Sequence, residues 1–221
     1  MTEATKRKRN AGSRLSTRNR PADDDMLEAC ITEMARVGGD RTTMDAVAEH
    51  VPTTKATLYA HFGSREQLLL AATERELASA TRWLYDAYDR NWKLKPELAI
   101  RAAVAALFDY ARARPHGFRV LLNTDHSAKG HHSGSNELTR ALERRVAQWI
   151  RTLQEGRGAD VGRGDSADVL AAICVSISTS LARTALNNDF DLDVVTALAT
   201  DATLHALRGL APVDLAKLDA R

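Results

Sequence analysis

Residues 54–62 of the chain read Thr54-Lys55-Ala56-Thr57-Leu58-Tyr59-Ala60-His61-Phe62. Leu58 and Phe62 are four residues apart, so in a helix they share one face. The rest of the segment carries hydrogen-bond donors and one cation but no acid: Thr54, Lys55, Thr57, Tyr59 and His61. Such a face suits phosphates and the base edges of a major groove. We therefore expect a short helix that packs by its apolar side and presents its polar side outward.

Two further helices are predicted before this segment. Over Asp23–Arg36, apolar residues recur at helical spacing, three aspartates open the pattern, and Gly38-Gly39 ends it. Over Thr43–His50 the apolar spacing recurs, Thr42-x-x-Asp45 is a candidate capping box, and Pro52 cannot continue the helix. The link 51–53 is as short as a helix-turn-helix requires. The three segments therefore predict a three-helix unit of that type.

The remainder of the chain also reads as helix. Ser64-x-x-Gln67 is a good capping box and opens a helix to Asn91, which would span about 40 Å. Pro96 suits the first turn of a fifth helix, and Pro115 ends that helix and starts a sixth. Helical stripes continue over 138–153, 166–187 and 191–208, and glycine-rich loops lie at 127–135 and 156–164. The fold class is predicted to be all-α, with about nine helices.

Length and charge divide this chain of 221 residues. With 44% hydrophobic and 27% charged residues it has ordinary globular composition, and its length allows one or two domains. Residues 1–22 carry seven basic residues and one acid, which leaves a net charge of −4 on the rest. We expect a flexible basic arm at 1–22, a helix-turn-helix domain at 23–70, a larger helical domain at 71–211 and a C-terminal tail at 212–221.

Several protein classes are excluded by simple patterns. Cys30 and Cys174 are far apart and form no CxxC motif, so neither a disulfide scaffold nor a zinc finger is expected. No apolar run approaches the length of a membrane span: Ala102–Phe108 has seven residues. The basic N-terminus has no apolar segment behind it, so it is not a secretory signal. The expectation is a soluble cytoplasmic protein with no membrane partner.

The chain resembles a known family over residues 26–70. Ala46-Val47-Ala48-Glu49, the segment 54–62 and Ser64-Arg65-Glu66-Gln67-Leu68-Leu69 are similar to the N-terminal signature of the tetracycline-repressor (TetR) family. The resemblance implies that Thr43, Tyr59, His61 and Arg65 contact DNA phosphates, and that Thr54, Lys55, Ala56 and Thr57 lie nearest the bases. It also implies that Leu58 and Phe62 belong to the core.

The turn before the polar helix departs from the family pattern. The family turn reads Ala-Gly-Val with the glycine at positive φ, whereas this chain has Val51-Pro52-Thr53. Proline is fixed near a φ of about −65° and cannot adopt that conformation. We therefore expect this turn to be built differently.

For the larger domain, the resemblance implies ligand binding and dimerisation. Helices 166–187 and 191–208 would form a four-helix bundle with a second copy, and small residues such as Ala172, Ser176, Ser180, Ala199 and Ala202 would allow close approach. Ile173, Ile177, Leu181, Leu198 and Ala202 are the expected dimer contacts. A largely apolar small-molecule effector would occupy a chamber lined by Phe108, Arg112, Phe118, Leu122, His126, Trp149, Cys174 and Ser178. Core packing within the chain is the alternative for each apolar residue in these sets, and a solvated side chain is the alternative for Arg112.

The functional prediction is a homodimeric regulator, most simply a repressor. Two recognition helices about one DNA turn apart, roughly 34–36 Å, would read an inverted repeat in double-stranded DNA. The resemblance further implies that effector binding moves the fourth helix and weakens DNA binding; the sequence itself contributes the continuous helix that links the two parts. The basic arm would add phosphate or minor-groove contacts, or is simply a charged terminus.

Two other functional classes remain open. An enzyme is not expected, because the chain lacks G-x-S-x-G, Walker A and H-E-x-x-H motifs, and the glycine run 156–162 has the wrong spacing for a dinucleotide site. Asp125, His126, His131 and His132 could bind a metal, but a solvated loop explains them better, so no metal or cofactor is predicted. The second alternative is a helical interaction protein whose helix-turn-helix has lost DNA binding, which only Pro52 favours.

Overall fold

The structure, a computed structural model, describes residues 23–122, 134–155 and 165–210, and in these residues it is all-α, as the sequence predicted. The described residues contain nine α-helices and one short 3-10 helix, and no strand. The chain divides after Ala72 into an N-terminal and a C-terminal compact unit. The predicted arm at 1–22 and the tail at 212–221 lie outside the described residues.

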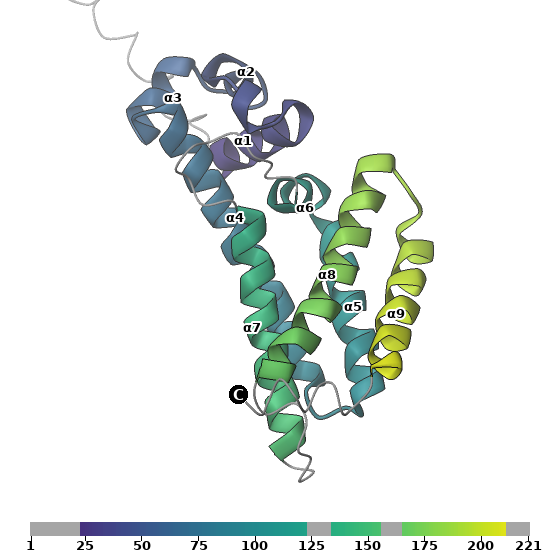
Figure 1. Ribbon diagram of the computed structural model, residues 1–221. Coiled ribbons are helices and arrows are strands. Elements are labelled where there is room, and N and C mark those ends of the chain that lie inside the picture. The colour runs from purple at the N-terminus through teal and green to yellow at the C-terminus, as the bar shows by residue number, and fades with distance from the viewer. Residues whose placement is uncertain (1–22, 123–133, 156–164, 211–221) are drawn as a thin grey trace, which may run out of the picture. The chain divides into compact units, whose positions relative to one another are not determined.

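The N-terminal unit is the predicted three-helix arrangement (Figure 1). It contains α1 (Asp23–Val37), η1 (Gly39–Arg41), α2 (Met44–Glu49), α3 (Lys55–Phe62) and the start of α4 (Arg65–Asn91). α2 packs against both α1 and α3. Its centre is formed by fully buried apolar side chains: Met26, Cys30, Ile31, Val47, Leu58 and Ala72. Leu58 therefore anchors α3 by its apolar side.

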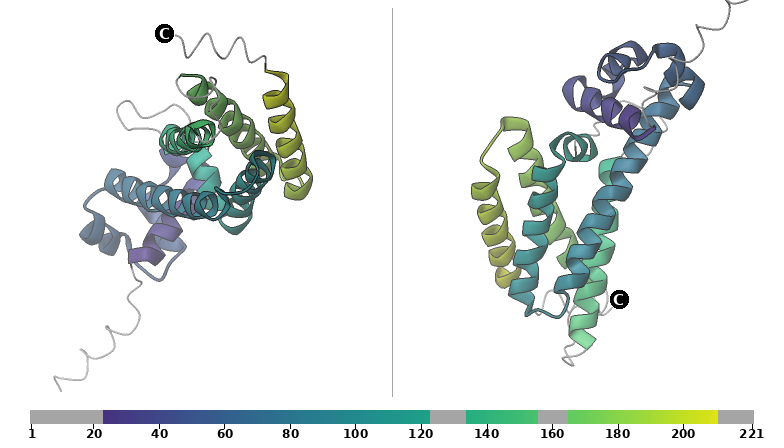
Figure 2. Two further views of the ribbon diagram at one scale, coloured as in Figure 1. Left: turned by 90° about the horizontal axis from the view of Figure 1, so that it is seen from below. Right: turned by 180° about the vertical axis from the view of Figure 1, so that it is seen from behind.

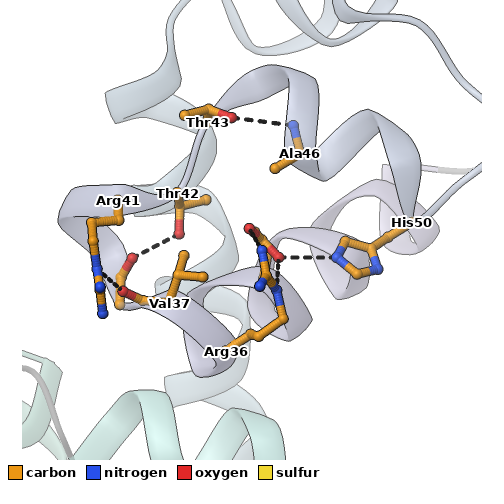
Figure 3. Close-up of polar contacts among 9 residues, drawn as sticks. Arg36, Val37, Arg41, Thr42, Thr43, Ala46 and His50 are labelled. Atoms are coloured by element: carbon orange, nitrogen blue, oxygen red, sulfur yellow. Dashed lines mark hydrogen bonds and ion pairs between the residues drawn. The ribbon is translucent and has the colours of Figure 1, made fainter.

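Two local details of this unit correct the sequence prediction. The residue that caps α2 is Thr43, whose Oγ1 accepts a hydrogen bond from the Ala46 amide at 3.2 Å. Thr42 is buried instead and its hydroxyl donates to the Gly38 carbonyl at 2.9 Å (Figure 3), so the Thr42-x-x-Asp45 capping box is wrong. Phe62 is only half-buried, in contrast to Leu58.

The turn between α2 and α3 is built without a left-handed residue. His50 caps α2 in a right-handed conformation, and the Thr53 amide donates to the Val51 carbonyl at 2.6 Å. Among the described residues Asp189 is the one non-glycine with positive φ, so Pro52 adopts none. The expectation of a different turn is confirmed. It leaves the buried Thr53 hydroxyl without a hydrogen-bond partner, a local cost in free energy.

The C-terminal unit is a bundle centred on α8 (Asp165–Asn188). α8 packs against α5 (Pro96–Ala113), α6 (Pro115–Leu122), α7 (Gly134–Glu155) and α9 (Leu192–Gly209). α8 and α9 lie side by side in both views of Figure 2. The core of the unit joins α4, α5 and α6 through fully buried side chains: Leu84, Phe108, Tyr110, Phe118 and Leu121.

A buried polar cluster joins α4, α5 and α6. The fully buried Glu76 carboxylate accepts a hydrogen bond from the Tyr110 hydroxyl at 2.6 Å and pairs with Arg114 Nη2 at 2.6 Å. Gly117, on α6, faces the same carboxylate, and a Cβ at this position would overlap it. The absence of a side chain at Gly117 is therefore what lets the carboxylate occupy this place.

α8 corrects the expectation about apolar segments. By length and composition it is apolar enough to cross a membrane, with a mean hydropathy of 1.7 over its best window. Small residues and hydroxyls interrupt its apolar residues, so no long unbroken run marks it in the sequence. It packs on four neighbouring helices, as the central helix of a bundle does.

Candidate nucleic-acid interface and ligand cavity

α3 presents its polar side outward. Thr54, Lys55, Ala56 and Tyr59 are exposed, and Thr57 is half-buried. Thr54 caps the helix, since its Oγ1 accepts a hydrogen bond from the Thr57 amide at 3.1 Å. This bond uses the hydroxyl oxygen as acceptor and fixes the threonine at the helix start. The surface of α3 thus offers hydroxyl donors, a cation and a phenol without a carboxylate of its own.

Lys55 and His61 of α3 each have an acidic partner from another helix. Lys55 Nζ lies 2.7 Å from Asp45 of α2, and this carboxylate raises the pKa of Lys55. His61 Nδ1 lies 2.9 Å from Asp23 of α1. Both aspartates are well exposed, so these pairs hold the side chains in place at little net free energy. The sequence reasoning missed both pairs because the partners meet only in the folded unit.

Arg65 is occupied by the protein backbone. Its guanidinium donates to the carbonyls of Thr42 at 2.5 Å, of Asp40 at 3.0 Å and of Gly39, and its Nη1 lies 3.2 Å from Glu66. These bonds hold the start of α4 against η1 and Thr42, which precede α2. To contact a DNA phosphate as predicted, Arg65 would have to use a guanidinium that already donates to these backbone carbonyls.

A buried carboxylate holds the C-terminus of α2 on α1. Glu33 is 1% exposed, and its oxygens accept hydrogen bonds from Arg36 at 2.7 and 2.8 Å and contact His50 Nε2 at 3.0 Å (Figure 3). Arg36, assisted by His50, lowers the pKa of Glu33 from 4.5 to about 2 against the effect of burial. His50 caps α2 just before the turn, so this cluster fixes where the turn and α3 begin.

The Glu33 cluster predicts a pH-dependent loss of stability in Glu33→Gln. The folded-state pKa lies below the unfolded value, so the contribution is complete above about pH 4.5 and disappears as the pH falls through about 2. Because Arg36 is 63% exposed, we expect Glu33→Gln to lower the free energy of unfolding by about 2 kcal/mol near neutral pH, which is less than the full pKa shift of Glu33 would give. Urea unfolding of both proteins between about pH 7 and pH 3 measures it.

The matched control is Glu66→Gln, which removes an exposed carboxylate from the same unit and should change the free energy of unfolding by less than about 0.5 kcal/mol. A difference between wild type and Glu33→Gln that stays constant down to about pH 3 would contradict the assignment.

The C-terminal unit contains a cavity of about 660 Å³. Its wall comes from the end of α4, from α5, α7 and α8, and from the end of α9. Most of the lining side chains are aliphatic or aromatic: Tyr88, Trp92, Pro96, Ala99, Ile100, Ala103, Val104, Leu107, Leu142, Val146, Trp149, Ile150, Leu170, Val175, Leu207 and Leu210. Both the volume and the apolar lining are those of a small-molecule site.

The structure brings together only part of the predicted chamber. Trp149, Cys174 and Ser178 line the cavity. Phe108, Phe118 and Leu122 are instead buried in the helical core, and Arg112 pairs on the surface with Asp109 at 2.7 Å and Asp193 at 2.6 Å. His126 lies outside the described residues, as do Asp125, His131, His132 and the glycine run 156–162. The cavity therefore lies on a different face of α5 from the one predicted.

The apolar stripes of α8 and α9 are only partly covered. Ile173, Ile177 and Leu181 are half-buried, Ala202 is exposed, and Leu198 is 58% exposed. Val169 and Val194 are exposed on the same two helices. Ala199 is fully buried within the chain, so its contacts are with the chain's own residues.

Comparisons with known proteins agree with this architecture. Residues 26–72 match the family model described as bacterial regulatory proteins, tetR family. The chain is 26% identical over 189 residues to the HTH-type transcriptional activator FasR of Mycolicibacterium smegmatis, covering 84% of this chain and 83% of the relative. It is 26% identical over 158 residues to the HTH-type transcriptional repressor NicS of Pseudomonas putida, covering 71% and 73%.

A solved structure extends the likeness to the whole fold. The transcriptional regulator FadR of Bacillus subtilis, solved in complex with stearoyl-CoA, superposes with a TM-score of 0.67 at 13% identity. The match covers 86% of this chain and all of the other chain. At this identity the likeness concerns the fold of the chain and nothing further.

Proposed function

We propose that this chain, whose residues 26–72 match the tetR family model, is a TetR-family transcriptional regulator: a homodimeric, cytoplasmic repressor released from an inverted-repeat operator by a small, largely apolar ligand. The observation that supports this proposal most strongly is α3. Leu58 is fully buried while Thr54, Lys55 and Tyr59 are exposed on the outer side, so the helix is presented as a major-groove reader requires.

The DNA contacts proposed for the individual residues follow from their positions. Lys55 and His61 would exchange Asp45 and Asp23 for phosphate oxygens, and Thr43 and Thr54 would donate their hydroxyl protons. Ala56 and Thr57 would face the bases. We assign Arg65 a supporting role, because its guanidinium donates to the carbonyls of Asp40 and Thr42 and so holds the segment that precedes α2.

The cavity supports a ligand-responsive regulator. Its apolar lining suits an apolar effector, and the structurally similar FadR was solved with stearoyl-CoA, a ligand with a long apolar chain. The wall includes the end of α4, a single helix that begins in the N-terminal unit at Arg65. A ligand that favours one position of α4 would change the affinity of the chain for DNA, because α4 connects the cavity with the N-terminal unit. Repression itself requires only that the protein occupies the operator. No catalytic role is proposed.

The exposed stripes support a dimer. Val169 on α8 and Val194 and Leu198 on α9 are exposed apolar side chains, which a second copy would bury in an isologous interface. Ile173, Ile177, Leu181 and Ala202 lie on the same two helices and remain the proposed contacts.

Binding to duplex DNA as a function of salt tests the proposal. The full chain should bind duplex DNA with an affinity that falls steeply as salt rises, because bound phosphates release counterions. Deleting residues 1–22, which carry a net charge of +6, should flatten this slope. Fluorescence anisotropy with a labelled duplex measures both. If the deletion leaves the salt dependence of binding unchanged, residues 1–22 do not contact DNA. If the full chain does not bind duplex DNA, the alternative of a helical interaction protein is favoured.

A further inference from the structure

One charged pair lies in the wall of the largely apolar cavity. Asp89 of α4 and Arg145 of α7 form an ion pair, and among the described residues that line the cavity they are the only Asp, Glu, Lys or Arg. Arg145 is 26% exposed and Asp89 is 60% exposed. Arg145 also lies over the Tyr85 ring, 5.6 Å from its centroid, and Nη1 is 3.4 Å from Gln148 Oε1. The cation is thus held in place while its acidic partner reaches solvent.

Most of the other polar side chains of the wall donate hydrogen bonds to the backbone of their own helix. The hydroxyls of Thr152, Ser178, Thr179 and Thr203 each donate to the carbonyl four residues earlier, and Asn91 donates to the Ala87 carbonyl. Burial raises the pKa of the Cys174 thiol to about 12 and also raises the pKa of Tyr88, so both groups are neutral. Arg145 is therefore the strongest hydrogen-bond donor that the cavity offers to a ligand.

From this arrangement we propose that the cavity selects a largely apolar molecule with a terminal carboxylate, which replaces Asp89 on the Arg145 guanidinium. The inference rests on the proposed function of the cavity as the effector site and names the chemical class of its ligand. A guanidinium matches a carboxylate through two parallel hydrogen bonds. The displaced Asp89 carboxylate has water available, so the exchange leaves no buried charge unpaired.

The same exchange connects the ligand with α4. Asp89 lies two residues before the end of α4, so a carboxylate bound to Arg145 removes one tie between α4 and α7. A neutral ligand of the same length would fill the apolar part of the cavity and leave this tie intact. The charge of the head group is therefore the feature that distinguishes an effector from a passive occupant.

Binding of matched ligands to the full chain tests the inference. Dodecanoic acid, dodecanol and methyl dodecanoate share one apolar chain and differ in the head group, and isothermal titration calorimetry near neutral pH gives their affinities. We expect the acid to bind on the order of 10- to 100-fold more tightly than either neutral ligand. Equal affinities for the three ligands would overturn the inference.

Two variants at the pair separate recognition from a structural role. Arg145→Ala should abolish the preference for the acid and leave the affinity for dodecanol within about twofold. Asp89→Asn removes the competitor and should raise the affinity for the acid several-fold without changing that for dodecanol. If the pair served only to hold α4 on α7, both variants would weaken all three ligands alike, and that result would contradict the proposal.

The matched control is Arg151→Ala. Arg151 lies on the same helix and pairs with Asp168 at 2.5 Å, but it does not line the cavity. The ratio of acid to alcohol affinity should stay as in wild type; a change as large as that of Arg145→Ala would contradict the inference. Duplex binding by the ligand-free wild type is measured separately, so a failure of head-group selection and a failure of DNA binding are distinguishable.

Discussion

Gly117→Ala is expected to lower the free energy of unfolding by about 3 kcal/mol, although alanine is ordinarily favoured over glycine inside a helix by about 1 kcal/mol. The new Cβ would overlap the Glu76 carboxylate, which is fully buried and held by Tyr110 and Arg114. Moving this carboxylate breaks charge-assisted hydrogen bonds in a buried place, which is costly. Thermal unfolding should show a fall in Tm of roughly 6–12 °C.

Two further variants make this result specific. Gly209→Ala, at the end of α9, meets no atom within 4 Å and should change stability by less than about 0.5 kcal/mol. In a Glu76→Ala background the obstacle is gone, so the Gly117→Ala penalty should largely disappear, giving a coupling energy of about 2 kcal/mol or more. A Gly117→Ala protein as stable as wild type would show that the carboxylate has room to move.

The double variant Lys55→Ala/Tyr59→Ala is expected to lower duplex affinity on the order of 100-fold while the fold is retained. Both side chains are exposed on α3, and the Lys55–Asp45 pair is too exposed to contribute much stability. Loss of one cation should also reduce the slope of log affinity against log salt by about 1. Anisotropy titrations give the affinities, and circular dichroism verifies the fold.

Arg82→Ala is the matched control for charge. It removes one exposed cation from α4 within the C-terminal unit and should leave duplex affinity within about twofold. If Arg82→Ala weakened binding as much as the double variant, the affinity would reflect net charge and not the surface of α3.

The sequence predicted the helices well because their ends carry local signals. Thr54, Ser64 and Pro96 stand at or next to the first residues of α3, α4 and α5, and the predicted ranges differ from the observed ones by a few residues at most. Capping and the fixed φ of proline act within one turn, so they can be read without the tertiary structure. Thr42 and Thr43 show the limit of this reading, since only the buried place of Thr42 decides which of the two is the cap.

The cavity could not be predicted in the same way. Phe108 and Leu107 are adjacent on α5 and equally apolar, yet only Leu107 lines the cavity, because the helices packed on α5 (α6, α8 and α9) determine which of its sides is covered. Arg112 and Arg145 are likewise both arginines on helices with apolar stripes, but only Arg145 lies in the cavity wall. The Glu33–His50 contact joins residues 17 apart, and no periodicity reports such a pairing. The outward face of α3 was predictable because its apolar and polar residues all lie within the nine residues 54–62 and their helical spacing separates them.

Selection of bound duplexes from random DNA tests most directly whether α3 reads a DNA sequence. The wild-type chain should enrich an inverted repeat whose half-sites are spaced about one helical turn, roughly 34–36 Å, and Lys55→Ala/Tyr59→Ala should enrich nothing under the same conditions. A pool that stays random with the wild-type protein, or the same motif recovered with the double variant, would contradict the assignment of α3 as the recognition helix.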